Sequence, residues 1–170
     1  WLAANGGASA SDVCSSVTWS NDFSTVSDGC GASGSVTVTF TATDDCGNDI
    51  TTSATFTIQD NTDPIISVQA ADLTVQCDGN GNISDLNNWL AANGGASASD
   101  VCSSVTWSND FSTVSDGCGA SGSVTVTFTA TDDCGNDTTT SATFTIQDTI
   151  PPVFTSELPH DITVSCDAIP

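Results

Sequence analysis

The stretch that decides the fold is Ser123–Asp148, which reads SVTVTFTATDDCGNDTTTSATFTIQD. Apolar side chains at Val124, Val126 and Phe128 alternate with threonines, and the alternation resumes at Ala142 after a polar turn. A period of two places the apolar side chains on one face of a strand, and two such runs around a short turn predict an antiparallel hairpin. Because the apolar face needs a second layer to cover it, the sequence predicts an all-β sandwich.

This stretch belongs to a long internal repeat, in which residues 1–60 recur as residues 89–148. Only one position differs, Ile50 in the first copy and Thr138 in the second, so 59 of 60 positions are identical. A repeat of this length predicts a tandem array of whole small domains rather than a solenoid.

A second, shorter match sets the phase of the repeat, because DLTVQC at Asp72–Cys77 resembles DITVSC at Asp161–Cys166. We therefore predict a repeat over residues 1–61 that lacks its first strand, a complete repeat over 62–149, and the first strand of a following repeat within 150–170. An incomplete repeat at each end fits a segment of a longer tandem array. It also fits a subunit whose C-terminal strand, Val153–Cys166, completes a neighbouring chain by strand addition. A structure with that strand free counts against the second interpretation.

Within the complete repeat we expect at least five strands and one short helical turn. Beyond the hairpin, we expect strands at residues 73–77, 96–100 and 105–111, and loops at 78–82 and 112–122. The helix covers Leu86, Trp89 and Leu90, with Ser84 or Asp85 as its N-cap. Proline-containing joints at residues 60–64 and 148–152 predict short, stiff linkers between repeats.

The charge of the chain excludes several classes of function. The sequence has 21 acidic residues, no Lys and no Arg, for a formal net charge of -21. A nucleic-acid-binding protein needs Lys or Arg to displace counterions, and so does a protein that docks on anionic lipid. Self-repulsion of this size opposes the compact state, and bound divalent cations would relieve it.

The eight cysteines indicate structural disulfides. No two of them are closer than 16 positions, whereas zinc sites favour close pairs of cysteines together with histidine. Disulfides in turn indicate an oxidising, extracellular setting.

The residues Val126–Asn136 (VTFTATDDCGN), with Phe144–Asp148 (FTIQD) and Pro151–Phe154 (PPVF), resemble the HYR-like, immunoglobulin-like repeats of giant surface adhesins in gliding bacteria that use type IX secretion. Asp72–Cys77 and Asn88–Gly95 are similar to the same arrays. The resemblance covers essentially the whole chain and implies extracellular β-sandwich domains strung into a fibre. HYR domains often carry a cysteine in the last strand, where this chain has Ser141 and Ala142, so the family's disulfide pattern cannot be transferred.

The topology of such an immunoglobulin-like sandwich suggests which cysteines share a pole of the domain. It predicts bonds between Cys77 and Cys118 and between Cys102 and Cys134. In the first repeat it predicts the equivalent bond between Cys14 and Cys46. Cys30 and Cys166 are then left for partners outside the chain or across subunits.

Two acidic segments are candidate calcium sites, each with a simpler interpretation. Asp78, Asn80 and Asn82 occur at alternate positions like the start of a calcium loop, but a turn and helix cap explains them as well. At the joint, carboxylates from the linker and the hairpin turn would meet around an ion, or remain solvated. These are Asp60, Asp63, Asp132, Asp133 and Asp137.

Other chemistry is sparse in this sequence. Thr138 and Thr149 follow aspartate in a pattern similar to bacterial O-glycosylation motifs, although unmodified surface threonine is an equal alternative. His160 is the single histidine and has no nucleophile in its context. No phosphate loop or nucleophile elbow appears, so we expect no enzyme, no catalytic residues and no cofactor other than Ca²⁺.

Together these observations predict the structural shaft of an extracellular filament or giant cell-surface adhesin, with neighbouring repeats or identical subunits as partners. Two alternatives stay open. One is a calcium-dependent adhesive binding module, and the other is a subunit that polymerises by exchange of its C-terminal strand.

Overall fold

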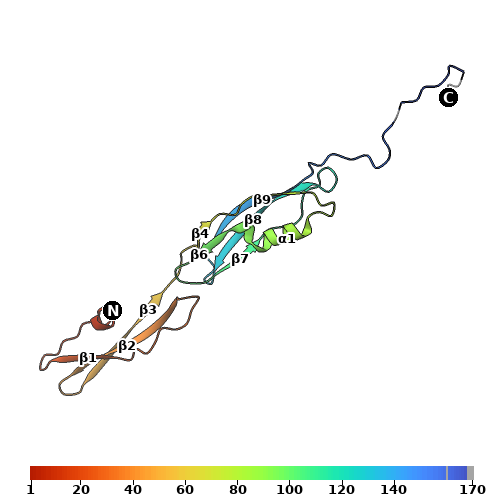
Figure 1. Cartoon of the computed structure of the whole chain (residues 1–170). Coiled ribbons are helices and arrows are strands. Elements are labelled where there is room, and N and C mark those ends of the chain that lie inside the picture. Colours follow the sequence, from red (N-terminus) through yellow and green to blue (C-terminus); the bar gives the residue numbers. More distant parts are fainter. Residues whose placement is uncertain (160, 168–170) are drawn as a thin grey trace.

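The computed structural model describes residues 1–159 and 161–167, so His160 lies outside the described residues. The chain consists mostly of β-strands in sheets with little helix, which confirms the all-β prediction. Two β-rich units lie end to end along one long axis, and the C-terminal segment extends beyond the second unit (Figure 1). We call them the first unit (residues 1–61) and the second unit (residues 62–149).

The first unit is a three-stranded antiparallel sheet preceded by the 3-10 segment η1 (Leu2–Gly7). Its strands are β1 (Val17–Asn21), β2 (Gly34–Asp44) and β3 (Asp49–Ile58), in the order β1-β2-β3. β3 therefore forms an edge of the sheet, with no further strand paired to it among the described residues.

The second unit contains two sheets and a short helix. Its elements are β4 (Ile65–Val68), β5 (Leu73–Gln76), α1 (Ile83–Ala91), η2 (Asn93–Gly95), β6 (Ser97–Ser99), β7 (Val105–Asn109), β8 (Gly122–Asp132) and β9 (Asp137–Gln147). β4 pairs with β6, while the other strands form a sheet in the order β5-β9-β8-β7. The β5–β9 pair is parallel, and the remaining pairs are antiparallel.

The hairpin predicted from Ser123–Asp148 is present as β8 and β9, with Val124 opposite Phe144 and Val126 opposite Ala142. The alternation works as expected, because Val126, Phe128 and Phe144 are fully buried. On the other face, Thr125 and Thr143 form a hydrogen-bonded cross-strand pair, with their hydroxyl oxygens 3.0 Å apart.

Helix α1 covers the apolar face of the hairpin. Its Leu86 and Trp89 join the core, and the Trp89 ring lies 5.3 Å from Phe128 and 5.7 Å from Phe144 between centroids. The indole N–H donates to the carbonyl of Ala71 at 3.0 Å, so this large side chain is buried without an unpaired donor. None of the helices in the described residues is long and apolar enough to cross a membrane.

Two details differ from the prediction. Strand β4 was not expected, and it gains its partner only from β6, more than 30 residues later. The N-cap of α1 is Asn82 rather than Ser84 or Asp85. Its backbone is left-handed, and its amide donates to the carbonyl of Gln76 and the carboxylate of Asp85. Asn82 therefore links the end of β5 to the helix, which a local capping pattern does not reveal.

The same face of the first unit is only partly covered. Trp1 packs on Phe40 and Phe56, with ring centroids 5.4 and 5.6 Å apart, but remains 43% exposed. A groove of about 420 Å³ opens beside it. The groove is lined by Trp1, Leu2, Ala3, Phe23, Val26, Val36 and Phe56. In the second unit, Trp89 and Phe144, which correspond to Trp1 and Phe56, belong to a buried core, and Leu73 and Val75 of β5 pack against that core.

Candidate functional site

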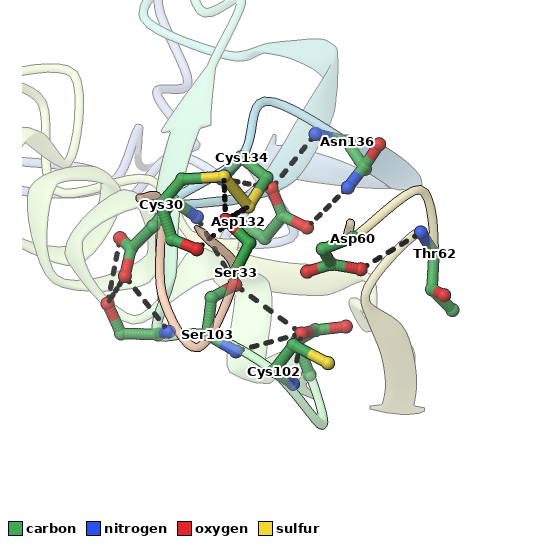
Figure 2. Close-up of a disulfide and its surroundings, with 12 residues drawn as sticks. Cys30, Ser33, Asp60, Thr62, Cys102, Ser103, Asp132, Cys134 and Asn136 are labelled. Atoms are coloured by element: carbon green, nitrogen blue, oxygen red, sulfur yellow. Dashed lines mark hydrogen bonds between the residues drawn. A yellow bond between two sulfur atoms is a disulfide. The ribbon is translucent and has the colours of Figure 1, made fainter. Parts of the chain in front are cut away.

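The two units are joined by a disulfide between Cys30 and Cys134, which Figure 2 shows at the centre of the joint. The Cα atoms are 5.0 Å apart although the residues are 104 positions apart in the sequence. Cys30 lies in the loop before β2, and Cys134 lies in the turn between β8 and β9. The bond therefore links a loop of one repeat to the hairpin turn of the next.

This pairing corrects the sequence prediction. Cys134 bonds to Cys30 and not to Cys102, so the predicted Cys102–Cys134 bond is wrong, and Cys30 has its partner inside the chain. The predicted bonds Cys14–Cys46 and Cys77–Cys118 are not formed either. The structure describes free thiols at Cys14, Cys46, Cys77, Cys102, Cys118 and Cys166. The prediction sought a partner for Cys134 within its own repeat and a partner for Cys30 outside the chain, whereas the joint brings the loop of the preceding repeat to Cys134.

The loop that carries Cys30 docks tightly on the second unit. The backbone N–H of Ala32 donates to the carbonyl of Cys102 at 2.7 Å. Gly31 has a φ of +56°, and a Cβ there would lie 2.5 Å from both the Cys102 carbonyl oxygen and the Ser103 Cβ. Only glycine fits this close approach with this backbone conformation.

Three carboxylates lie together beside the disulfide. Asp60 comes from the linker after β3, Asp100 follows β6, and Asp132 ends β8. Each offers an oxygen atom, and these three oxygens all lie within 4.8 Å of one another. In Figure 2 the side chains of Asp60 and Asp132 lie side by side near the Cys30–Cys134 bond.

Asp132 is 5% exposed and is the acceptor that organises the hairpin turn. Its Oδ1 accepts the backbone N–H groups of Cys134 and Asn136, and its Oδ2 accepts the Asn136 amide at 2.7 Å. Desolvation raises the pKa of Asp132, but the hydrogen bonds from Asn136 and from the turn backbone outweigh it and lower the pKa below its ordinary value. This carboxylate is therefore ionised at neutral pH.

The other predicted joint carboxylates do not enter this cluster. Asp63 and Asp137 are exposed. Asp133 is also exposed and accepts hydrogen bonds from the backbone N–H and hydroxyl of Ser104. Conversely, Asp100 was missed, although it stands two positions before Cys102, a residue that the sequence analysis placed at the same pole as Cys134.

The predicted loop at Asp78–Asn82 forms a tight turn. Asp78 Oδ1 accepts the backbone N–H groups of Asn80 and Asn82, while Asn82 Oδ1 accepts the N–H of Asp78. These oxygens are directed to the backbone of the loop. The contacts favour the interpretation as a turn and helix cap.

The two candidate glycosylation positions lie in different environments. Thr138 is half-buried on β9. Thr149 is exposed, and its hydroxyl donates to the side-chain oxygen of Gln76 at 2.7 Å. Of the two, Thr149 is the more accessible to a modifying enzyme.

The C-terminal segment does not fold back on the chain. Residues 150–159 and 161–167 are exposed and form no strand. The segment therefore lies free, which is the outcome expected to count against polymerisation by strand exchange.

Comparison with known proteins adds no family to these observations. The sequence matches no protein-family model, and no curated protein matches it.

Proposed function

We propose that this chain forms part of the shaft of an extracellular filament or giant cell-surface adhesin, built of disulfide-bonded immunoglobulin-like repeats. The observation that carries the proposal is the Cys30–Cys134 bond, because it joins consecutive repeats to each other. A free-standing domain has no use for such a bond, whereas a fibre under load has.

The bond uses positions that recur in every repeat. Cys118 lies 88 positions after Cys30, and Cys46 lies 88 positions before Cys134, in identical local sequence. If each joint of an array forms the same bond, Cys118 joins the hairpin turn of the following repeat. Cys46 then joins the loop of the preceding repeat. This assigns partners to two of the cysteines that are free in the present chain.

The resulting covalent path through each repeat is short. Cys118 and Cys134 flank β8, which is already an extended strand. The 16 positions between them span about 54 Å at about 3.4 Å per residue. A full repeat of 88 residues would extend to about 300 Å if it were unfolded. A shaft whose strands are linked end to end by disulfides can therefore lengthen little under tension.

The sheet arrangement supports the immunoglobulin-like part of the proposal. The pair β4–β6 is separate from the sheet β5-β9-β8-β7, and β5 pairs with the last strand in parallel. Two sheets over one core, with a short first strand divided between them, are consistent with an immunoglobulin-like sandwich.

The setting of the shaft follows from its chemistry. A disulfide indicates an oxidising environment outside the cytoplasm. An external location agrees with the absence of Lys and Arg, because a chain without them has no cleavage site for trypsin-like proteases.

The free C-terminal segment counts against a second candidate function, polymerisation by strand exchange, but the groove in the first unit favours it. The exposed edge of β3 and the apolar groove beside Trp1 occupy the place that corresponds to β5 and its contacts in the second unit. The segment Asp161–Cys166 of another copy has the sequence to fill that place, because it matches Asp72–Cys77. In a continuous array, the equivalent strand of the same chain would fill it instead.

One measurement tests the shaft and separates these two forms. Native material is boiled in detergent, and its mass is determined with and without reductant. A mass of hundreds of kilodaltons in both conditions supports a continuous array. A ladder that collapses to the mass of a 170-residue chain only on reduction supports a polymer of subunits. A single small species in both conditions would overturn the proposal.

A further inference from the structure

The cluster of Asp60, Asp100 and Asp132 has a feature that an ordinary group of surface carboxylates lacks. Asp60 is only 8% exposed, and its Oδ1 accepts the backbone N–H of Thr62 at 3.1 Å. Its Oδ2 is buried and has no hydrogen-bond partner in the part of the chain that the structure describes. A buried carboxylate oxygen without a partner is costly, so this atom indicates a missing ligand.

The two neighbouring carboxylates cannot supply that ligand. Every hydrogen bond to Asp100 goes to its Oδ1, from Cys102 and Ser103. Asp132 accepts all of its bonds from its own turn. A carboxylate in its charged form has no proton to donate, so three charged groups with oxygens within 4.8 Å of one another would repel.

Neither a lysine nor an arginine can neutralise this charge, because the sequence contains none. A bound water could donate to the unpartnered oxygen but would leave the negative charge in place, so only a proton or a metal cation neutralises the cluster. A proton would satisfy one carboxylate at a time, whereas a divalent cation satisfies all three at once.

We infer that Asp60, Asp100 and Asp132 bind one Ca²⁺ ion at the joint between the two units. Carboxylate oxygens are the ligands of hard cations, and Ca²⁺ binds oxygen at about 2.3–2.6 Å in flexible geometry. Two oxygens that bind the same Ca²⁺ ion lie at most about 4.6–5.2 Å apart. The three oxygens all lie within 4.8 Å of one another, so they are close enough to share one ion. Mg²⁺ requires shorter distances and near-ideal octahedral geometry, so three carboxylates spaced up to 4.8 Å apart suit it less.

The ion would act on the joint itself. Asp60 belongs to the linker, whereas Asp100 and Asp132 belong to the body of the second unit. Ca²⁺ bound to all three fixes the linker against the hairpin turn that carries Cys134. The inference goes beyond the proposed shaft, because it rests on three side chains and not on the number of repeats.

The repeat supplies matched controls within the same chain. Asp12 and Asp44 are the first-unit equivalents of Asp100 and Asp132, 88 positions earlier, in identical local sequence. Asp44 makes the same turn contacts as Asp132, with Cys46 and Asn48. Asp12 and Asp44 line an open hollow of about 190 Å³ together with Asp49. Among the described residues, only Asp60, Asp100 and Asp132 bring three carboxylate oxygens within 4.8 Å of one another, so the first-unit aspartates form no equivalent cluster.

The experiment uses the whole oxidised chain, stripped with a chelator and titrated with CaCl₂ in an isothermal calorimeter at 0.15 M NaCl. We expect one Ca²⁺ site that binds more tightly than the non-specific association of Ca²⁺ with surface carboxylates. Asp60→Asn, Asp100→Asn and Asp132→Asn should each weaken that site at least tenfold. Asp12→Asn and Asp44→Asn remove the same charge and the same turn contacts, and they should leave it unchanged.

Three results would overturn the inference. The first is equal loss of binding in Asp44→Asn and Asp132→Asn, which would mean diffuse attraction. The second is unchanged binding in Asp60→Asn. The third is a combined result: Ca²⁺ leaves the melting temperature unchanged, and Asp60→Asn is more stable than wild type in chelator. That result would mean that a proton occupies the site. The thiol count of each variant reports the Cys30–Cys134 bond separately, so failure of the ion site leaves the shaft proposal standing.

Discussion

The disulfide between the units makes a quantitative prediction about extension under force. When the two ends of the oxidised chain are pulled apart, the 104 positions between Cys30 and Cys134 are shielded, because tension passes through the bond. Substitution Cys30→Ser exposes them. At about 3.3–3.6 Å per residue they add about 340–370 Å of contour length, and the 5.0 Å that already separates the two Cα atoms is negligible beside this.

The assay is single-molecule stretching of the chain between handles at its two ends. The matched control is Cys118→Ser, which removes the same residue from the same loop sequence but leaves the Cys30–Cys134 bond intact. We expect oxidised wild type and Cys118→Ser to extend without the 104 shielded positions, and Cys30→Ser to gain their contour length. Added reductant should convert wild type to the long form.

Two outcomes would refute the reasoning. If oxidised wild type extends as far as Cys30→Ser, no bond joins the units. If Cys118→Ser extends as far as Cys30→Ser, a different pair of cysteines holds them. Peptide mapping of the wild type alone cannot decide, because cleavage before every aspartate releases the same peptide from residues 28–43 as from 116–131. It also releases the same one from 45–48 as from 133–136.

The remaining predictions concern packing and pH. Gly31→Ala should slow re-formation of the Cys30–Cys134 bond after reduction, measured by thiol count. Gly119 also has a positive φ, but a Cβ there would have open space around it, so Gly119→Ala should not slow re-formation of the bond. Trp89→Ala should cost about 3–5 kcal/mol of unfolding free energy by urea titration; Trp1→Ala should cost less, because Trp1 is 43% exposed. The N–H groups of Asn80 and Asn82 lower the pKa of Asp78. Asp78→Asn should therefore be less stable than wild type at pH 7, and this difference should vanish as the pH falls below about 3.9, through the folded pKa. A difference in stability that persists at pH 2 would contradict this.

The sequence predicted the parts of the fold that local periodicity determines. The alternation around Val126 and Phe128 predicted the hairpin correctly, because a shift of one residue would expose the whole apolar face. The helix over Leu86 and Trp89 followed from the same logic. Strand β4 was missed because four residues after a proline carry too little periodicity, and its partner is distant in the sequence.

The candidate site was harder to predict, because it lies between units. The structure brings together Asp60 and Asp132, two of the five carboxylates expected at the joint, and adds Asp100. Asp100 was not expected, since nothing in its local sequence distinguishes it from a turn aspartate. The pairing of Cys134 failed for a related reason. The argument from poles of a sandwich compares positions within one domain, and it cannot show that the preceding domain places Cys30 at the same pole.

The chemistry of the joint follows from the charge of the chain. A net charge of -21 with no Lys or Arg means that two consecutive repeats repel each other, and no salt bridge can hold them together. The loop that docks on the second unit consists of Gly31, Ala32 and Ser33, so it offers little apolar side chain for contact at the joint. Besides hydrogen bonds such as that from Ala32 to the Cys102 carbonyl, covalent bonds and bound cations can hold such units in line. The joint contains the first, and three convergent carboxylates with an unpartnered buried oxygen fit the second. A surface without Lys or Arg is therefore compatible with the proposed shaft, because the joint does not depend on the ion pairs that this composition removes.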